Sequence, residues 1–184
     1  MISLKTVGRR FETEAEIIAG GSGKVRGIIT ETDQNQAPSY IFIAPRHIFR
    51  TRWPTPVRPG MVLQTEASGL FVLGDNGPSE RSEGVLFQSF RMFQVTHKLP
   101  WVRRGRAIDP ITRLETEAVP QNLGEIYVAI EPTDREELDR RIAMSAEKAR
   151  ILTGAPIQAD DLVGDYKVIR SDVQLGLRVG MLEY

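Results

Sequence analysis

The side chains that most often perform catalysis or bind metals are sparse in this chain. Its 184 residues include two histidines and no cysteine. His47 and His97 each flank an expected strand, and neither lies in a metal-ligand spacing such as His-Glu-x-x-His. Because a catalytic metal site usually takes three protein ligands, structural or surface roles explain both histidines better. The chain also lacks a Gly-x-Ser-x-Gly elbow that would present a serine nucleophile.

The glycine-rich segment at residues 19–24 invites a phosphate-loop interpretation, because the backbone amides of such a loop can cradle phosphates. A Walker A motif would need glycine at Ile18 and serine or threonine at Val25, where the hydroxyl binds the metal ion. Both positions fail, so a flexible turn between two strands is favoured.

Paired carboxylates occur at Glu115 and Glu117 and at Asp160 and Asp161, but nothing in the sequence places either pair in a pocket. Such pairs usually belong to a solvated face. We therefore expect a protein that is not an enzyme, with no catalytic residue, no metal and no cofactor. A hydrolase with a dispersed carboxylate site remains a lesser alternative.

A basic cluster follows Trp101 and comprises Arg103, Arg104 and Arg106. Arginines beside an aromatic ring can contact phosphates or stack on bases. A solvated or subunit-contacting loop is the favoured interpretation. The chain has 24 Lys and Arg residues and 24 Asp and Glu residues, so its net charge is zero and does not attract nucleic acid from a distance. Trp53 and Trp101 both lie in expected loops, where tryptophans anchor interfaces or cap a core. These five residues are our candidates for subunit or DNA contact.

Elements that could position these residues centre on Arg58–His97. Met61–Thr65 and Leu70–Leu73 are predicted to form a hairpin that closes at Gly69, where φ would be positive. Val85–Val95 is the longest apolar run and is predicted to be a strand. The pattern indicates a small antiparallel sheet around which the rest of the protein folds.

Val85–Val95 does not alternate cleanly between apolar and polar residues. A one-residue bulge near Ser89 would reconcile its two halves. Burial of both faces, one by the core and one by a neighbouring subunit, would do so too. Shorter strands are expected at Val25–Thr32, Tyr40–Ala44, Ile126–Ile130, Gly164–Arg170 and Gly176–Leu182. The prolines of Arg46–Pro59 predict a surface loop.

Thr133–Leu152 is the single predicted helix. Thr133 and Glu136 have the capping-box spacing, and apolar residues recur at three- and four-residue steps. Gly154 and Pro156 would end the helix.

The composition is that of an ordinary soluble globular protein, with 41% hydrophobic and 26% charged residues. No segment approaches the about 20 apolar residues of a membrane helix, so no membrane association is expected. Residues 1–7 lack the apolar region of a signal peptide, and the absence of cysteine fits intracellular folding.

The predicted fold class is mainly β: a small antiparallel β-barrel or sandwich with long loops and one α-helix in the C-terminal half. Residues 1–97 would form the first part of the barrel core. Residues 98–122 would form an extended loop or arm, since about 25 residues without periodicity is long for a connection. Residues 123–184 would add a strand, the helix 133–152 and a C-terminal hairpin that completes the barrel or is appended to it.

The chain resembles the head-to-tail joining proteins of tailed bacteriophages, of the connector or stopper type. The resemblance rests on Arg58-Pro-Gly-Met61 leading into a strand, on Ser68–Leu73, and on Gly84–Val95, about 40 residues in all. It implies a compact β-barrel whose long loops reach neighbouring copies, in a ring stacked on the portal or connector. The segment 98–122 would be the reaching arm.

The function that follows is a structural virion protein, assembled in the host cytoplasm, that forms a homo-oligomeric ring at the head-tail junction. It would act as connector, stopper or tail-completion protein, joining portal to tail proteins and helping retain DNA in the lumen. The alternative is a β-rich module that binds single-stranded nucleic acid or a small ligand.

Overall fold

The computed structural model describes residues 12–31, 45, 47–65, 69–76, 80–82, 84–132 and 149–183. Strands make up most of this part of the chain, and none of its residues is helical. The strands are β1 Thr13–Ala19, β2 Gly23–Glu31, β3 His47–Arg52, β4 Val62–Thr65, β5 Gly69–Asp75, β6 Glu80–Ser82, β7 Val85–Gln94, β8 His97–Arg103, β9 Arg106–Ile108, β10 Glu115–Glu117, β11 Gln121–Pro132, β12 Ala149–Thr153, β13 Leu162–Val163, β14 Tyr166–Gln174 and β15 Leu177–Glu183. The predicted mainly β class is confirmed, and of the two predicted architectures, barrel or sandwich, the structure contains an antiparallel barrel.

The N-terminal half forms a ring of antiparallel strands, which we call the first barrel. Its sheet runs in the order β3-β2-β1-β4-β5-β7-β6, and β3 also pairs with β7. This extra pairing joins the two sides, so six strands close on themselves and only the short β6 remains outside. Phe49, Phe71 and Phe90 fill the interior together with smaller aliphatic residues.

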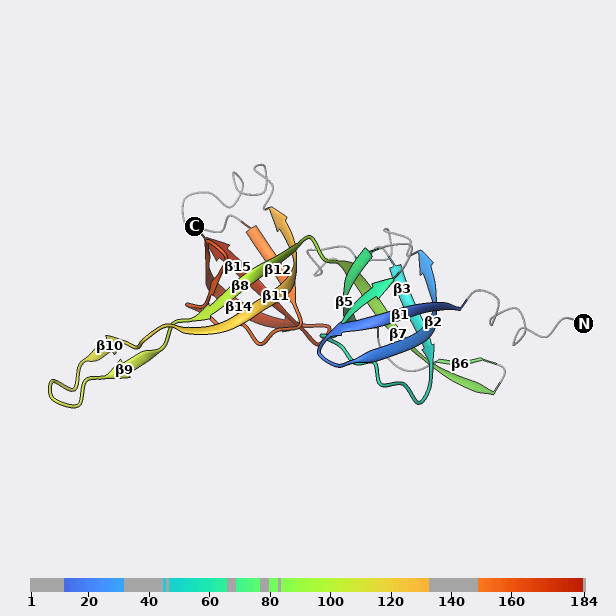
Figure 1. Cartoon of the computed structure of the whole chain (residues 1–184), viewed down its shortest axis with the longest axis horizontal. Coiled ribbons are helices and arrows are strands. Elements are labelled where there is room, and N and C mark those ends of the chain that lie inside the picture. Colours follow the sequence, from blue (N-terminus) through green and yellow to red (C-terminus); the bar gives the residue numbers. More distant parts are fainter. Residues whose placement is uncertain are drawn as a thin grey trace, which may run out of the picture.

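The C-terminal half closes into a second barrel with the order β11-β12-β15-β14-β13-β8. Its interior holds Trp101, Val128, Ile151 and Leu182 among other buried apolar residues. Figure 1 shows the two barrels side by side, with a thin two-stranded hairpin, β9–β10, projecting from the second barrel away from the first.

Both barrels have the same strand order. When the strands are counted within each barrel, each ring reads first, second, third, sixth, fifth, fourth, and the fourth pairs with the first. The fourth strand thus returns beside the first after two hairpins, which is a Greek-key connection. The chain is therefore a tandem repeat in topology, although its sequence shows no internal repeat.

A third apolar cluster joins the barrels. Val72 and Phe93 of the first barrel pack with Leu152 and Leu177 of the second, and all four side chains are almost fully buried. The backbone N–H of Asp75 also donates to the carbonyl oxygen of Leu175 at 2.7 Å. Shared burial of this kind stabilises the relative position of the two barrels.

Local turn chemistry accounts for two hairpins. Gly69 opens β5 with φ of 92°, as the sequence predicts, and Thr65 pairs with Gly69 across the hairpin. The C-terminal hairpin turns at Leu175 and Gly176, whose φ angles of 52° and 72° are both positive. Two successive positive φ values are typical of the tight turns that match strand twist.

The predicted helix 133–152 is wrong at its C-terminal end. Residues 149–153 form β12, and all five side chains are buried. Ile151 faces the interior of the second barrel while Leu152 faces the first barrel. Because both faces are buried, the strand lacks alternation and its pattern resembles the end of a helix. Residues 133–148 lie outside the described part of the chain.

The surface loop predicted at residues 46–59 is also wrong in its first half. His47–Arg52 is β3, which closes the first barrel against β7. Its buried positions, Phe49 and Thr51, alternate with more exposed histidine, isoleucine and arginine residues. The prolines at positions 54, 56 and 59 interrupt regular structure only after this strand has ended. The predicted strand at residues 40–44 lies outside the described residues.

Strand β7 pairs with β3 without a register shift across Ser89, so the expected bulge is absent there. Its two faces are instead both buried. Phe90 and Met92 point into the first barrel, and Phe93 joins the cluster between the barrels. At Phe93 the outer face is covered by the second barrel of the same chain.

Only the two ends of the segment 98–122 belong to the second barrel. Residues up to Arg103 continue β8, and β11 begins at Gln121. Between them, residues 104–120 contain the β9–β10 hairpin, and we call this segment the arm. It extends the hairpin between the first and second strands of its barrel.

Candidate functional site

A buried carboxylate organises the open end of the second barrel near the arm. Asp161 is 1% exposed. Its oxygens accept hydrogen bonds from the Trp101 indole N–H at 2.8 Å, from Arg103 at 3.1 Å and from the backbone N–H of Gln158 at 2.9 Å. Arg103 also donates to the carbonyl oxygen of Pro156. Charge-assisted bonds of this kind are strong and directional.

This network decides the role of two candidate residues. Trp101 is 8% exposed, and the Arg103 guanidinium lies 5.1 Å from its ring centroid. Both side chains hold β8 to the loop that carries Asp161. Arg103 therefore has a structural partner, and an acidic residue that looked like half of a surface pair is buried. Asp160 faces elsewhere and pairs with Lys167 at 2.9 Å.

The remaining arginines lead into the arm. Arg104 is exposed, and the backbone of Arg106 pairs with Glu117 across the β9–β10 hairpin. The arm carries large apolar side chains in the open: Ile108 is 70% exposed, Ile111 90%, Leu114 67% and Val119 90%. Exposed apolar residues gathered on one projecting element are typical of an interaction surface.

The tip of the arm is an ordered turn built on Asp109. Its carboxylate accepts hydrogen bonds from the backbone N–H of Ile111 at 2.8 Å and from the Thr112 hydroxyl at 2.8 Å. These donors, with the backbone N–H of Thr112, hold the pKa of Asp109 below its usual value of 3.8. The turn presents Ile111 at the far end of the arm. The sequence interpretation missed these apolar residues, although large aliphatic residues isolated among charges and prolines could have signalled them.

Trp53 lies at the end of β3 on the first barrel and is 54% exposed. Beside it is a pocket of about 590 Å³, lined by Glu12, Lys24, Val25, Arg26, Thr51, Arg52, Pro54, Thr55 and Pro56. Its charged residues are paired: Lys24 with Glu14 at 2.7 Å, and Arg52 with Glu12 at 2.9 Å. Both side chains of the Lys24–Glu14 pair are exposed, so this pair stabilises the fold little. We call this surface the Trp53 pocket.

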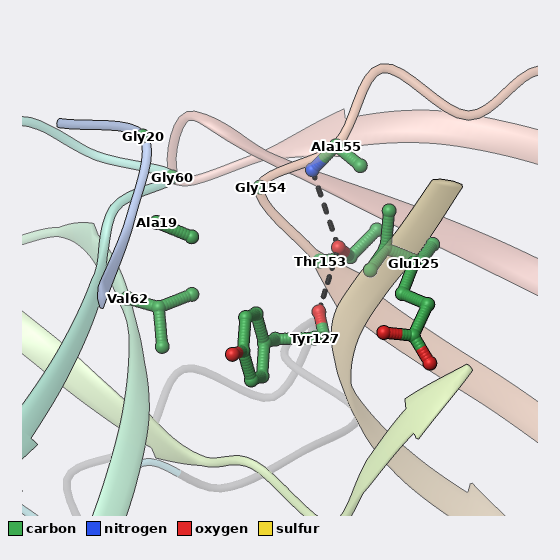
Figure 2. Close-up of a pocket in the computed structure, with 10 residues that line it drawn as sticks. Ala19, Gly20, Gly60, Val62, Glu125, Tyr127, Thr153, Gly154 and Ala155 are labelled. Carbon is green, nitrogen blue, oxygen red and sulfur yellow. Dashed lines mark hydrogen bonds between the residues drawn. The ribbon is translucent and has the colours of Figure 1, made fainter. Parts of the chain in front are cut away.

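A second pocket of about 200 Å³ lies between the barrels (Figure 2). Ala19, Gly20 and Val62 of the first barrel face Tyr127 and Thr153 of the second across it. The Thr153 hydroxyl donates to the carbonyl oxygen of Tyr127 at 2.8 Å and accepts from the backbone N–H of Ala155. The space is smaller than the about 300 Å³ at which cofactor and drug-sized sites begin. It is a gap left by small residues at the barrel interface.

The two histidines remain apart. His47 packs edge-on against Phe71, and His97 Nδ1 lies 2.9 Å from the Thr96 hydroxyl. Among the residues described, no group of three or more histidines and carboxylates is placed to bind a metal ion. The described strands and loops include no helix of the length and hydropathy that would cross a membrane. The side chains of Glu115 and Glu117 lie outside the description.

Comparisons with protein-family models, with curated proteins and with solved structures gave no match to this chain.

Proposed function

We propose that this protein is a structural subunit that assembles into a ring at the head-tail junction of a tailed bacteriophage. In that position it would join portal to tail, as connector, stopper or tail-completion protein, and help retain DNA. The observation that carries the proposal is the arm, a projecting hairpin with four exposed large apolar residues. The resemblance to head-to-tail joining proteins supplies the place of assembly.

The arm has two features that contact with a partner molecule would stabilise. A two-stranded hairpin in water is marginally stable, and it needs further strands or a packing surface to persist. The β9–β10 hairpin pairs only with itself within the sheets of the described structure. Its apolar residues and open strand edges would both be covered if the arm lay on another molecule. A ring subunit has such a partner in every neighbour.

The test is electron microscopy of the purified protein, alone and mixed with purified portal complexes. We expect rings alone at high concentration, or rings capping the portal. A matched variant with residues 106–117 replaced by a short Gly-Ser linker keeps both barrels and should not form them. Monomers at every concentration, with no density added to the portal, would count decisively against the proposal.

A further inference from the structure

We propose that the arm of one copy docks on the Trp53 pocket of the next copy, so that neighbouring subunits repeat the packing seen between the two barrels of one chain. This inference rests on the proposed ring assembly and names its interface. The starting observation is the shared strand order, which gives every element of the first barrel an equivalent in the second.

Within the chain, the turn of the first barrel's first hairpin, β1–β2, meets the second barrel. Ile18 and Ala19 belong to the apolar cluster between the barrels. Ala19 and Gly20 line the smaller pocket opposite Tyr127 of β11 and the segment that follows β12. The first hairpin of one barrel thus contacts the second strand and the end of the third strand of the other.

The Trp53 pocket is the equivalent place on the first barrel. It is lined by Lys24–Arg26 of the second strand, β2, by Thr51 and Arg52 at the end of the third strand, β3, and by Pro54–Pro56 just after it, next to Trp53. The equivalent surface of the second barrel, at Tyr127 and the end of β12, is covered by the first barrel. In the first barrel every residue lining the pocket comes from that barrel or the segment leading into it, and Trp53 remains half exposed.

The arm is the equivalent of the β1–β2 turn. It extends the second barrel's first hairpin, β8–β11, and projects from the end of the molecule away from the first barrel (Figure 1). It therefore cannot reach the Trp53 pocket of its own chain, but the same packing repeated between molecules would bring it to the pocket of another copy. Ile111 and Leu114 would then meet Trp53 and Pro54, apolar side chains on both sides.

Arm and pocket are different surfaces, so this contact is heterologous. A row of copies joined in this way keeps one free pocket at one end and one free arm at the other, so such contacts close into a ring or grow into a filament. This is the symmetry that a ring subunit requires.

Cysteine cross-linking tests the contact directly, because the natural chain contains no cysteine. Ile111→Cys protein is mixed with Pro56→Cys protein and oxidised. We expect a disulfide-linked dimer in this mixture, and much less in the matched mixture with Val173→Cys, an exposed position on β14. Equal yields in both mixtures, or no cross-link in either, would overturn the inference.

Self-association of charged variants gives a second readout. Ile111→Asp and Trp53→Asp should each weaken association at least about tenfold in sedimentation experiments, as loss of a buried anchor does, while Val173→Asp leaves it unchanged. If both variants assemble as well as the wild-type protein does, the arm does not dock on the Trp53 pocket, while the proposed function stands. If the wild type stays monomeric with and without portal, the proposed function fails first.

Nucleic acid at the same pocket is the competing outcome. A single-stranded oligonucleotide that changes Trp53 fluorescence, together with assembly unaffected by Trp53→Asp, would assign the pocket to nucleic acid and overturn the docking of the arm.

Discussion

Asp161 shows how one buried side chain holds distant segments of the second barrel together. Its partners Trp101 and Arg103 lie about 60 residues away in the chain, at separations of 60 and 58. Replacing the carboxylate by an amide would remove its charge and turn an NH2 group toward the guanidinium, indole and backbone donors that now share its two oxygens. Replacing one member of such a network lowers the free energy of unfolding by more than the intact network contributes, because the remaining polar groups stay buried without partners.

We therefore predict that Asp161→Asn lowers the free energy of unfolding by about 3 kcal/mol, measured by urea denaturation. The control is Asp172→Asn, which removes an exposed pair with Arg170 at 2.9 Å and should change stability by less than about 0.5 kcal/mol. Equal losses in the two variants would show that Asp161 does not organise the barrel.

The order of the arm's tip depends on pH through Asp109. The pKa of Asp109 is lowered in the folded state by the backbone N–H of Ile111, then by Thr112. A lowered pKa means that the ionised carboxylate favours the turn. This contribution is fully present above the unfolded value of 3.8 and is lost as the pH falls through the folded value.

Acidification below about pH 4 should accordingly loosen the tip of the arm before either barrel unfolds. Amide hydrogen exchange of Ile111 and Thr112 is the measurement, and Asp109→Ala should give the same fast exchange at neutral pH. Protection that persists in Asp109→Ala at neutral pH would mean that the turn forms without its carboxylate.

The contact between the barrels depends on two glycines. A Cβ added at Gly154 would overlap the backbone of Gly60, which cannot move aside as a flexible side chain would. Gly154→Ala should therefore destabilise the protein by about 2 kcal/mol in chemical denaturation. Gly21→Ala is the matched control, because its Cβ would meet the mobile end of Met61 and the side chain of Ile17. A smaller loss at Gly154 than at Gly21 would contradict this account.

At the scale of the whole molecule, we expect the shared apolar cluster to make the two barrels unfold as one cooperative unit. Leu177 is 1% exposed and packs among residues of both barrels. Leu177→Ala should lower the free energy of unfolding by about 3 kcal/mol without splitting the transition.

The two tryptophans allow this to be measured, since Trp53 belongs to the first barrel and Trp101 to the second. In Trp53→Phe protein, fluorescence reports the second barrel alone while far-ultraviolet circular dichroism reports both. Coincident midpoints are expected, with and without Leu177→Ala. Two separated transitions would mean that the barrels fold independently.

The sequence alone determined the features that depend on residues close together in the chain, namely turns and strands. Gly69 marks its hairpin because only a residue tolerant of positive φ closes that turn. The apolar run of β7 and the alternation of Ile126, Val128 and Ile130 in β11 identify strands. The mainly β class and the expectation of a small antiparallel barrel or sandwich followed from such local signals. The basic cluster also drew attention to the base of the arm.

The tertiary structure decided what depends on distant residues. Ring closure by β3 and β7, the repeated strand order and the pairing of Arg103 with Asp161 leave no local pattern, because their partners are far apart in the chain. Burial on both faces removed the alternation that would have identified β12 as a strand. Exposure of Ile111 is likewise a tertiary property, since an apolar residue becomes a docking side chain only where the fold leaves it uncovered.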